Sequence, residues 1–331
     1  MHLFTLERPP DLIAALALGA DGPATEYIAG GTDMIPLLKD ELRRPDRLVA
    51  LRPGVLDDAI EIGARGELHL GAGALMSEVA DHPDVRRAFP LIAAALLASA
   101  SPQIRNMATL GGNLLQRTRC PYYRDAGVST CNKRRPSSGC AALEGDNRHH
   151  AVLGGSDHCI ATHPSDLAVA LVALDATVHL RGLRGERRVA LEAFYRVPGD
   201  TPEIETVIEA GELITAIEVP GGEALARHAH YLKMRDRASF EFALVSAAVA
   251  LDVDGDRIRD ARVAMGGVAT VPWRLRSVEQ ALVGIPTDPV GYPAAVARAT
   301  AGAVPRSHNA FKVDLMPRVL LRALEIAGRR R

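Results

Sequence analysis

Four cysteines crowded into one short stretch constrain this 331-residue chain more than any other feature. They are Cys120, Cys131, Cys140 and Cys159, and the rest of the chain contains no cysteine. Small secreted proteins that depend on disulfides distribute their cysteines over the whole fold, so this pattern argues against that class. Thiolates gathered in one segment favour a shared set of metal ligands instead.

The spacing of the cysteines is C-x10-C-x8-C-x18-C. Zinc modules usually contain tight C-x2-4-C knuckles, and bacterial ferredoxins contain C-x2-C-x2-C runs; neither pattern is present. Four thiolates can still hold an iron–sulfur cluster if the intervening loops fold around it. The surroundings favour this hypothesis, because residues 117–135 contain six basic side chains and one acidic side chain. Nearby cations stabilise a negatively charged cluster.

Three other interpretations of this stretch stay open. The cysteines can be unrelated buried thiols, or the basic run can be a patch that binds RNA or a partner protein. The cysteines can also hold a structural zinc ion, together with one of His149, His150, His158 or His163. The chain as a whole has 39 Lys and Arg against 40 Asp and Glu, which excludes a nucleic-acid binder driven by overall charge.

Two glycine pairs indicate sites where the backbone can approach a phosphate-rich cofactor. The first pair lies in IAGGTDM, residues 28–34, between a predicted strand at 26–29 and a predicted helix at 34–42. The second lies in TLGGN, residues 109–113. Glycines permit close backbone approach, and successive N–H groups at a helix start attract anions. Neither pair follows the G-x-G-x-x-G dinucleotide pattern, so each alone is also compatible with an ordinary turn.

The order of the predicted elements indicates an α+β chain in three segments. Residues 1–53 alternate strand and helix, with Asp11 capping the first helix and Thr32 or Asp33 capping the second. Residues 54–220 open with a hairpin at 59–72, and the cysteine-rich insertion interrupts them at about 114–162. Further predictions for this segment are helices at 90–100 and 166–175 and strands at 177–180, 189–191 and 213–219. Residues 221–331 contain strands followed by helices, the last of them at 315–327.

No segment predicts membrane insertion or export. The longest apolar run, residues 89–100, is too short and too rich in alanine to span a bilayer. The N-terminus lacks the pattern of a signal peptide, so we expect a cytoplasmic protein. The sequence also lacks the H-E-x-x-H, G-x-S-x-G and Walker A motifs, and no catalytic residue is predicted.

Taken together, these motifs resemble the FAD-binding subunits of the xanthine dehydrogenase (molybdenum hydroxylase) family. The resemblance extends over essentially the whole chain and rests on YIAGGTDM (27–34), QIRNMATLGGN (103–113), HPSD (163–166) and YLKMRDR (231–237). The insertion, with LLQRTRCPYYR at 114–124, is similar to that of aldehyde oxidoreductase FAD subunits that carry an extra [4Fe–4S] cluster. The medium subunit of 4-hydroxybenzoyl-CoA reductase also has an inserted cluster and is the close alternative.

The resemblance implies a two-lobed FAD-binding domain of the PCMH (vanillyl-alcohol oxidase) type, followed by a C-terminal α/β domain of the CO dehydrogenase flavoprotein type. It implies that the four cysteines ligate the cluster. The cofactor contacts that it implies are Ile28, Ala29, Gly30, Gly31, Thr32, Asp33, Met34, Thr109, Gly112, Asn113, Asp166, Ile214 and Lys233.

Specific roles in FAD binding follow from the same resemblance. Residues 28–34 would wrap the FAD diphosphate, Asp166 would hydrogen-bond a ribose hydroxyl, and Lys233 would lie near the isoalloxazine. An aromatic ring faces the flavin in a family member, but the aligned position here is near Ser99 or Ala100. The sequence therefore leaves the residue that faces the flavin open.

The implied function is that of an electron-transfer subunit in a heterotrimeric, molybdenum-dependent aldehyde oxidoreductase. A large subunit with the molybdenum cofactor and a small [2Fe–2S] subunit would be the partners, and FAD would pass electrons to an external acceptor. Neither nucleic acid nor membrane insertion is expected, although a partner's twin-arginine signal could carry the complex to the periplasm. The alternatives from other classes are a zinc-stabilised interaction protein with a basic RNA- or partner-binding insert and a stand-alone flavin oxidase.

Overall fold

In the computed structural model, which describes residues 1–22 and 24–329, the N-terminal lobe is a small parallel sheet. Its order is β1-β3-β2, with strands β1 (Thr5–Glu7), β2 (Thr25–Ile28) and β3 (Arg47–Ala50). Helix α1 (Leu12–Gly19) begins at Asp11 as predicted, and the Asp11 carboxylate accepts a hydrogen bond from Ala14 N at 2.8 Å. Helix α2 (Met34–Lys39) is shorter than predicted, because Glu41 adopts a positive φ of 56° that ends helical geometry.

The second lobe is built on a five-stranded antiparallel sheet in the order β4-β5-β8-β6-β7. Its strands are β4 (Ile60–Ile62), β5 (Leu68–Gly71), β6 (Thr177–Gly182), β7 (Gly185–Ala190) and β8 (Leu213–Val219). The predicted hairpin is confirmed, with Ile60 opposite Leu70. The strand predicted at 189–191 is displaced, because β7 pairs with β6 from Gly185 to Ala190 and helix α10 (Leu191–Phe194) follows at once.

In the described chain, six short helices cover one side of this sheet, and two of them, α5 and α9, form a buried layer between this sheet and the C-terminal sheet. The helices are α3 (Met76–Asp81), α4 (Pro83–Ala88), α5 (Pro90–Ala98), α6 (Pro102–Arg105), α7 (Leu110–Leu114) and α9 (Asp166–Ala173). All eight residues of α9 are buried, as expected for a helix that is apolar on nearly every side. Helix α5 ends earlier than predicted, because Ala100 has a φ of 51°.

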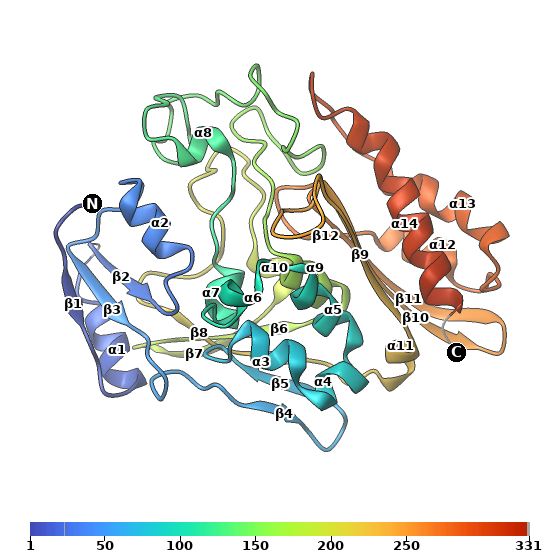
Figure 1. Ribbon diagram of the computed structural model, residues 1–331, viewed down its shortest axis with the longest axis horizontal. Helices are drawn as coiled ribbons and strands as arrows, with labels where there is room; N and C mark the ends of the chain where they lie inside the picture. Colours follow the sequence, from blue (N-terminus) through green and yellow to red (C-terminus); the bar gives the residue numbers. More distant parts are fainter. Residues whose placement is uncertain (23, 330–331) are drawn as a thin grey trace.

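The C-terminal part is a four-stranded antiparallel sheet in the order β12-β11-β10-β9. Its strands are β9 (His228–Met234), β10 (Val245–Asp254), β11 (Arg257–Gly266) and β12 (Trp273–Arg274). Its helices are α11 (Glu223–Arg227), α12 (Arg276–Leu282), α13 (Tyr292–Val296) and α14 (Phe311–Arg329). Helix α14 packs on one face of the sheet, while α5 and α9 pack on the other face (Figure 1).

The insertion at residues 114–162 consists almost entirely of irregular loops, which lie between α2 and α14 at the top of Figure 1. Its one helix is α8 (Pro121–Arg124), and an isolated bridge pairs Cys131 with Cys140. The C-terminal part anchors its end, because Lys312 donates to the carbonyl of His150 at 2.9 Å. Among the described residues, no helix is long and apolar enough to cross a membrane.

Candidate cofactor site

A cavity of about 1030 Å³ opens between the three parts of the chain. It is larger than an ordinary small-molecule pocket and has the capacity for a dinucleotide. Every residue predicted to contact a cofactor lines it: Ile28, Ala29, Gly30, Gly31, Thr32, Asp33, Met34, Thr109, Gly112, Asn113, Asp166, Ile214 and Lys233. The fold thus brings together residues from β9, β8, α7, α9 and the turn between β2 and α2.

The turn between β2 and α2 forms one wall, and its two glycines have different reasons to be there. A Cβ atom at Gly30 would lie 1.7 Å from the carbonyl oxygen of Met107, so only glycine permits this approach of the two segments. Gly31 has a φ of +72°, in the left-handed region that favours glycine. The glycine pair therefore fixes the backbone path along the cavity.

The second wall is the short helix α7, which carries the other glycine pair. Thr109 caps this helix by accepting a hydrogen bond from Gly112 N at 3.2 Å. The buried side chain of Asn113 accepts a hydrogen bond from Ser165 Oγ at 2.6 Å, which ties α7 to the start of α9. The two segments that flank the insertion in the sequence, 109–113 and 163–166, are thus joined directly in space.

Asp166 and Lys233 form a buried ion pair with 2.7 Å between Oδ2 and Nζ, and their side chains are 6% and 3% exposed. Asp166 also accepts hydrogen bonds from Tyr231 OH at 2.7 Å and Ser99 Oγ at 3.1 Å. Burial, together with the adjacent Asp166 carboxylate, raises the pKa of Tyr231 well above its ordinary value, so Tyr231 donates its proton. This cluster joins α9, β9 and the end of α5 at the cavity wall.

No aromatic side chain occupies the position at Ser99 and Ala100, but two phenylalanines reach the cavity from the loop after β9. Phe240 and Phe242 line the cavity and are 56% and 40% exposed. The guanidinium of Arg119 lies 5.0 Å from the ring centroid of Phe242, so an insertion residue contacts this loop. Neither ring was predicted to reach the cofactor, although SFEF at 239–242 contains two of only six phenylalanines in the chain.

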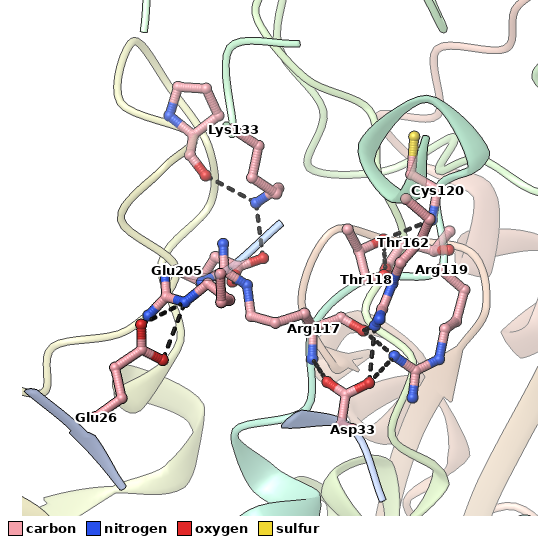
Figure 2. A network of polar contacts seen from close by, with 12 residues as sticks. Glu26, Asp33, Arg117, Thr118, Arg119, Cys120, Lys133, Thr162 and Glu205 are labelled. Atoms are coloured by element: carbon pink, nitrogen blue, oxygen red, sulfur yellow. Dashed lines mark hydrogen bonds and ion pairs between the residues drawn. The ribbon is translucent and has the colours of Figure 1, made fainter. Parts of the chain in front are cut away.

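Asp33 connects the glycine turn to the insertion (Figure 2). It occupies the N-cap position of α2, one of the two predicted, but its side chain makes no capping hydrogen bond. Its carboxylate instead accepts hydrogen bonds from Arg117 N at 2.8 Å, Arg124 Nη2 at 2.9 Å and the Arg119 guanidinium. Burial raises the pKa of Asp33, against the opposing charge of Arg124 and the N–H of Arg117.

Glu205 forms the second centre of this network and contacts the insertion from the loop before β8 (Figure 2). Lys133 Nζ lies 2.8 Å from its Oε1, and Arg117 Nε lies 2.6 Å from its Oε2. Burial raises the pKa of Glu205, but the charges of Arg117 and Lys133 outweigh this effect and keep the pKa below its ordinary value. The carboxylate is therefore ionised at neutral pH.

The four cysteines, all free thiols, line one small pocket beside the large cavity. Ala161 N donates to Cys159 Sγ at 3.5 Å. Backbone N–H groups of Tyr122 and Tyr123 lower the pKa of Cys120, and those of Ala142, Leu143 and Ile160 lower the pKa of Cys140, although burial outweighs both effects. His150 Nε2 lies 3.1 Å from Cys120 Sγ. Burial raises the pKa of the Cys120 thiol to about 12 and that of Cys159 to about 11.

The thiol pocket and the large cavity share a wall made by Lys133, Cys159 and Ala161. Among the described residues, no three His, Cys, Asp or Glu side chains converge as ligands of a single metal ion. The cysteines that line the pocket lie on loops that have no strand or helix apart from α8.

Comparisons with known proteins cover the whole fold. Residues 3–222 match the family model of the FAD binding domain in molybdopterin dehydrogenase, and residues 229–327 match that of the CO dehydrogenase flavoprotein C-terminal domain. The aldehyde oxidoreductase FAD-binding subunit PaoB of Escherichia coli is 44% identical over 98% of both chains. The carbon monoxide dehydrogenase medium chain of Afipia carboxidovorans is 27% identical over 99% of this chain and 97% of its own.

Solved structures of related enzymes share the fold over nearly the whole chain. A chain of reconstituted CO dehydrogenase from Oligotropha carboxidovorans has a TM-score of 0.76 at 25% identity, covering 99% of this chain and 98% of its own. A chain of quinoline 2-oxidoreductase from Pseudomonas putida has a TM-score of 0.75 at 26% identity, covering 98% and 96%. The predicted fold class is confirmed, and the chain belongs to the FAD-binding medium subunits of the molybdenum hydroxylase family of oxidoreductases.

Proposed function

We propose that this chain is the electron-transfer subunit of a heterotrimeric, molybdenum-dependent aldehyde oxidoreductase and holds both FAD and a [4Fe–4S] cluster. The observation that carries the proposal is the position of the four cysteines around a pocket that shares a wall with the FAD cavity. The 44% identity to an aldehyde oxidoreductase FAD-binding subunit supports the choice of enzyme class.

The large cavity fits FAD in size and in chemistry. Its glycine turn has a backbone path that leaves no room for a Cβ at Gly30, and its lining combines apolar side chains with the Asp166–Lys233 pair. FAD, when bound, accepts electrons one at a time and releases them in pairs. The chain's own part is to hold the cofactor: the glycine turn along the diphosphate, Asp166 toward a ribose hydroxyl, and Lys233 beside the isoalloxazine.

The thiol pocket suits a cluster because backbone N–H groups act on three of its four sulfurs. Backbone N–H groups directed at Cys120, Cys140 and Cys159 stabilise thiolates, as they do around iron–sulfur clusters. Lys133 adds a positive charge near Cys159. A four-iron cluster takes one thiolate at each iron, so its ligands surround a pocket instead of converging on one point. Cys120, Cys131, Cys140 and Cys159 would hold it, and it would supply one-electron transfer.

The partners and the division of the chain complete the proposal. A small [2Fe–2S] subunit would deliver electrons, and a large subunit with the molybdenum cofactor would carry out substrate chemistry. We place the first FAD-binding lobe at 1–53, the second at 54–220 with the insertion at about 114–162, and the C-terminal domain at 221–331. The complex would work in the cytoplasm, or in the periplasm if a partner carries a twin-arginine signal.

Purification of the native complex, followed by flavin and metal analysis, tests the proposal. We expect one FAD per chain, iron in excess of that in the [2Fe–2S] clusters, and reduction of the flavin by aldehydes. A complex without FAD would contradict the flavoprotein assignment. Zinc in place of the extra iron would favour the zinc-stabilised interaction protein, and turnover by the isolated chain would favour a stand-alone flavin oxidase.

A further inference from the structure

Positive charge exceeds negative charge where the insertion meets the glycine turn. The ion-paired network at this point, most of which Figure 2 shows, contains the cations Arg43, Arg117, Arg119, Arg124 and Lys133 and the carboxylates Glu26, Asp33 and Glu205. All eight side chains line the large cavity. Each cation contacts one of these carboxylates, but five cations against three carboxylates leave the network with a net charge of +2.

Three of these five cations are largely withdrawn from water, so the excess positive charge is costly. The side chains of Arg124, Arg117 and Lys133 are only 17%, 19% and 8% exposed. Burial lowers the pKa of Arg124, and the neighbouring charge of Arg117 adds to this effect. A buried charge is stable only when it is paired or hydrogen-bonded. Asp40 acts on Arg124 through space but makes no ion pair among the described residues.

The surplus lies beside the turn that carries Gly30 and Gly31, because two of its arginines donate to Asp33 of that turn. Arg124 donates hydrogen bonds from Nε and Nη2. Its Nη1 has no hydrogen-bond partner among the described residues and can therefore donate to a ligand. A guanidinium binds phosphate oxygens well because its N–H groups form a planar fork. A diphosphate diester carries two negative charges, which match the net charge of +2 in the network.

We propose that Arg119 and Arg124, both from the cysteine-rich insertion, bind the diphosphate of the dinucleotide cofactor in the large cavity. The insertion then has a second task besides holding the thiols, since it supplies cations to a site whose other wall is backbone. The inference rests on the FAD site of the proposed function and does not depend on the cluster.

The test uses the full chain freed of flavin, with FAD, riboflavin and ADP as probes. Arg124→Met and Arg119→Met should each weaken FAD binding about ten- to a hundredfold, the effect of removing one charge-assisted hydrogen bond. Riboflavin, which has no phosphate, should bind these variants as it binds the wild type. Arg124→Lys keeps the charge and should lose less affinity. Arg135→Met is the matched control, because this insertion arginine is exposed and its side chain, among the described residues, donates one hydrogen bond, to Ser129 O.

The wild-type chain alone provides a second test that needs no variant. Its affinity for FAD should fall as salt increases while that for riboflavin stays constant, and ADP should compete with FAD. Equal losses of FAD and riboflavin binding in the variants would show that the arginines only shape the cavity, and would overturn the inference. Unchanged FAD affinity, or affinity that salt does not alter, would overturn it too. A wild-type chain that binds neither flavin would instead contradict the proposed function.

Discussion

The glycine turn at residues 28–34 and the insertion at residues 114–162 line neighbouring cavities, but their backbones are held in different ways. The turn is fixed at both ends by regular elements, β2 and α2, and by the close approach to Met107. The insertion has no sheet of its own. The side chains of Asp33 and Glu205 hold it on one side, and Lys312 together with backbone hydrogen bonds from Val152 and Leu153 to Val268 holds it on the other. One wall of the cofactor site thus depends mainly on backbone geometry and the other on buried charges. Substitutions in the two regions should therefore have different effects on stability and on cofactor binding.

Loss of a thiol should have the largest effect, and it should change the iron content without a matching change in the flavin content. In Cys131→Ala we expect the iron of the cluster to be lost, because one of four ligands is gone, while much of the FAD remains in the glycine-lined cavity. Iron and flavin contents of the purified variant measure this. Ser129→Ala, an exposed position in the same loop, is the control. Full iron content in Cys131→Ala would refute the ligand assignment.

Gly30→Ala alters the glycine turn at residues 28–34. Its Cβ would lie 1.7 Å from Met107 O, so the two segments must move apart. We expect a loss of about 2–3 kcal/mol in the free energy of unfolding, as for an overpacked core, and weaker FAD binding. Denaturant unfolding and flavin content measure the effect. Gly182→Ala on strand β6, where the new Cβ meets only Glu212 Cγ at 3.3 Å, should be nearly neutral. Equal effects at both glycines would contradict the role of the close approach.

Asp33→Asn tests the connection between the two regions. The amide cannot replace the carboxylate that Arg119 and Arg124 share, so we expect a loss of about 1–3 kcal/mol that is concentrated in the insertion. Hydrogen exchange should show faster exchange in residues 114–135 and little change in α5. Asp157→Asn is a suitable control, because the Asp157 side chain is 94% exposed. Uniform exchange over the whole chain would show that Asp33 does not act locally.

The smallest effect concerns Lys312, which holds the end of the insertion, and its contribution to the pH dependence of stability. Burial, and to a lesser degree the charge of Arg148, lowers the Lys312 pKa from 10.5 to about 7. Above pH 7 the folded chain releases this proton while the unfolded chain retains it up to about pH 10, so the contribution to stability rises with pH. The rise approaches about 1.4 kcal/mol per pH unit.

The difference between the wild type and Lys312→Met isolates this contribution, because the other titrating groups are common to both chains. The free energy of unfolding, measured at pH 7.5 and 8.5, should rise more for the wild type than for the variant. Parallel changes in the two chains would show that Lys312 keeps its ordinary pKa in the folded state.

Local patterns were sufficient to predict much of the frame. Asp11 as a cap, the hairpin at 59–72 and the apolar helix at 166–175 depend on neighbouring residues, and the structure contains all of them. The environment of Asp33 could not be predicted, because its partners Arg119 and Arg124 lie 86 and 91 residues away. The two roles predicted for this residue, a helix cap and a cofactor contact, gave no indication of these two arginines.

The same limit applies to the loop residues around the cavities. Glu205 meets Lys133 over a separation of 72 residues, and neither side chain belongs to a recognisable pattern. Phe240 and Phe242 reach the cavity only because β9 and β10 place their connecting loop there. Irregular segments carry no hydrophobic period, so their final positions depend on tertiary contacts that a single sequence does not contain.

The buried layer formed by α5 and α9 has a consequence for how the protein unfolds. The core that surrounds α9 includes Tyr231, Ala248 and Ala264, which belong to the C-terminal sheet. A cut between residues 222 and 229 would separate the two matched domain families but would expose the apolar faces on both sides. We therefore expect the second lobe and the C-terminal sheet to unfold as one cooperative unit in a single transition, and neither half to be stable when expressed by itself.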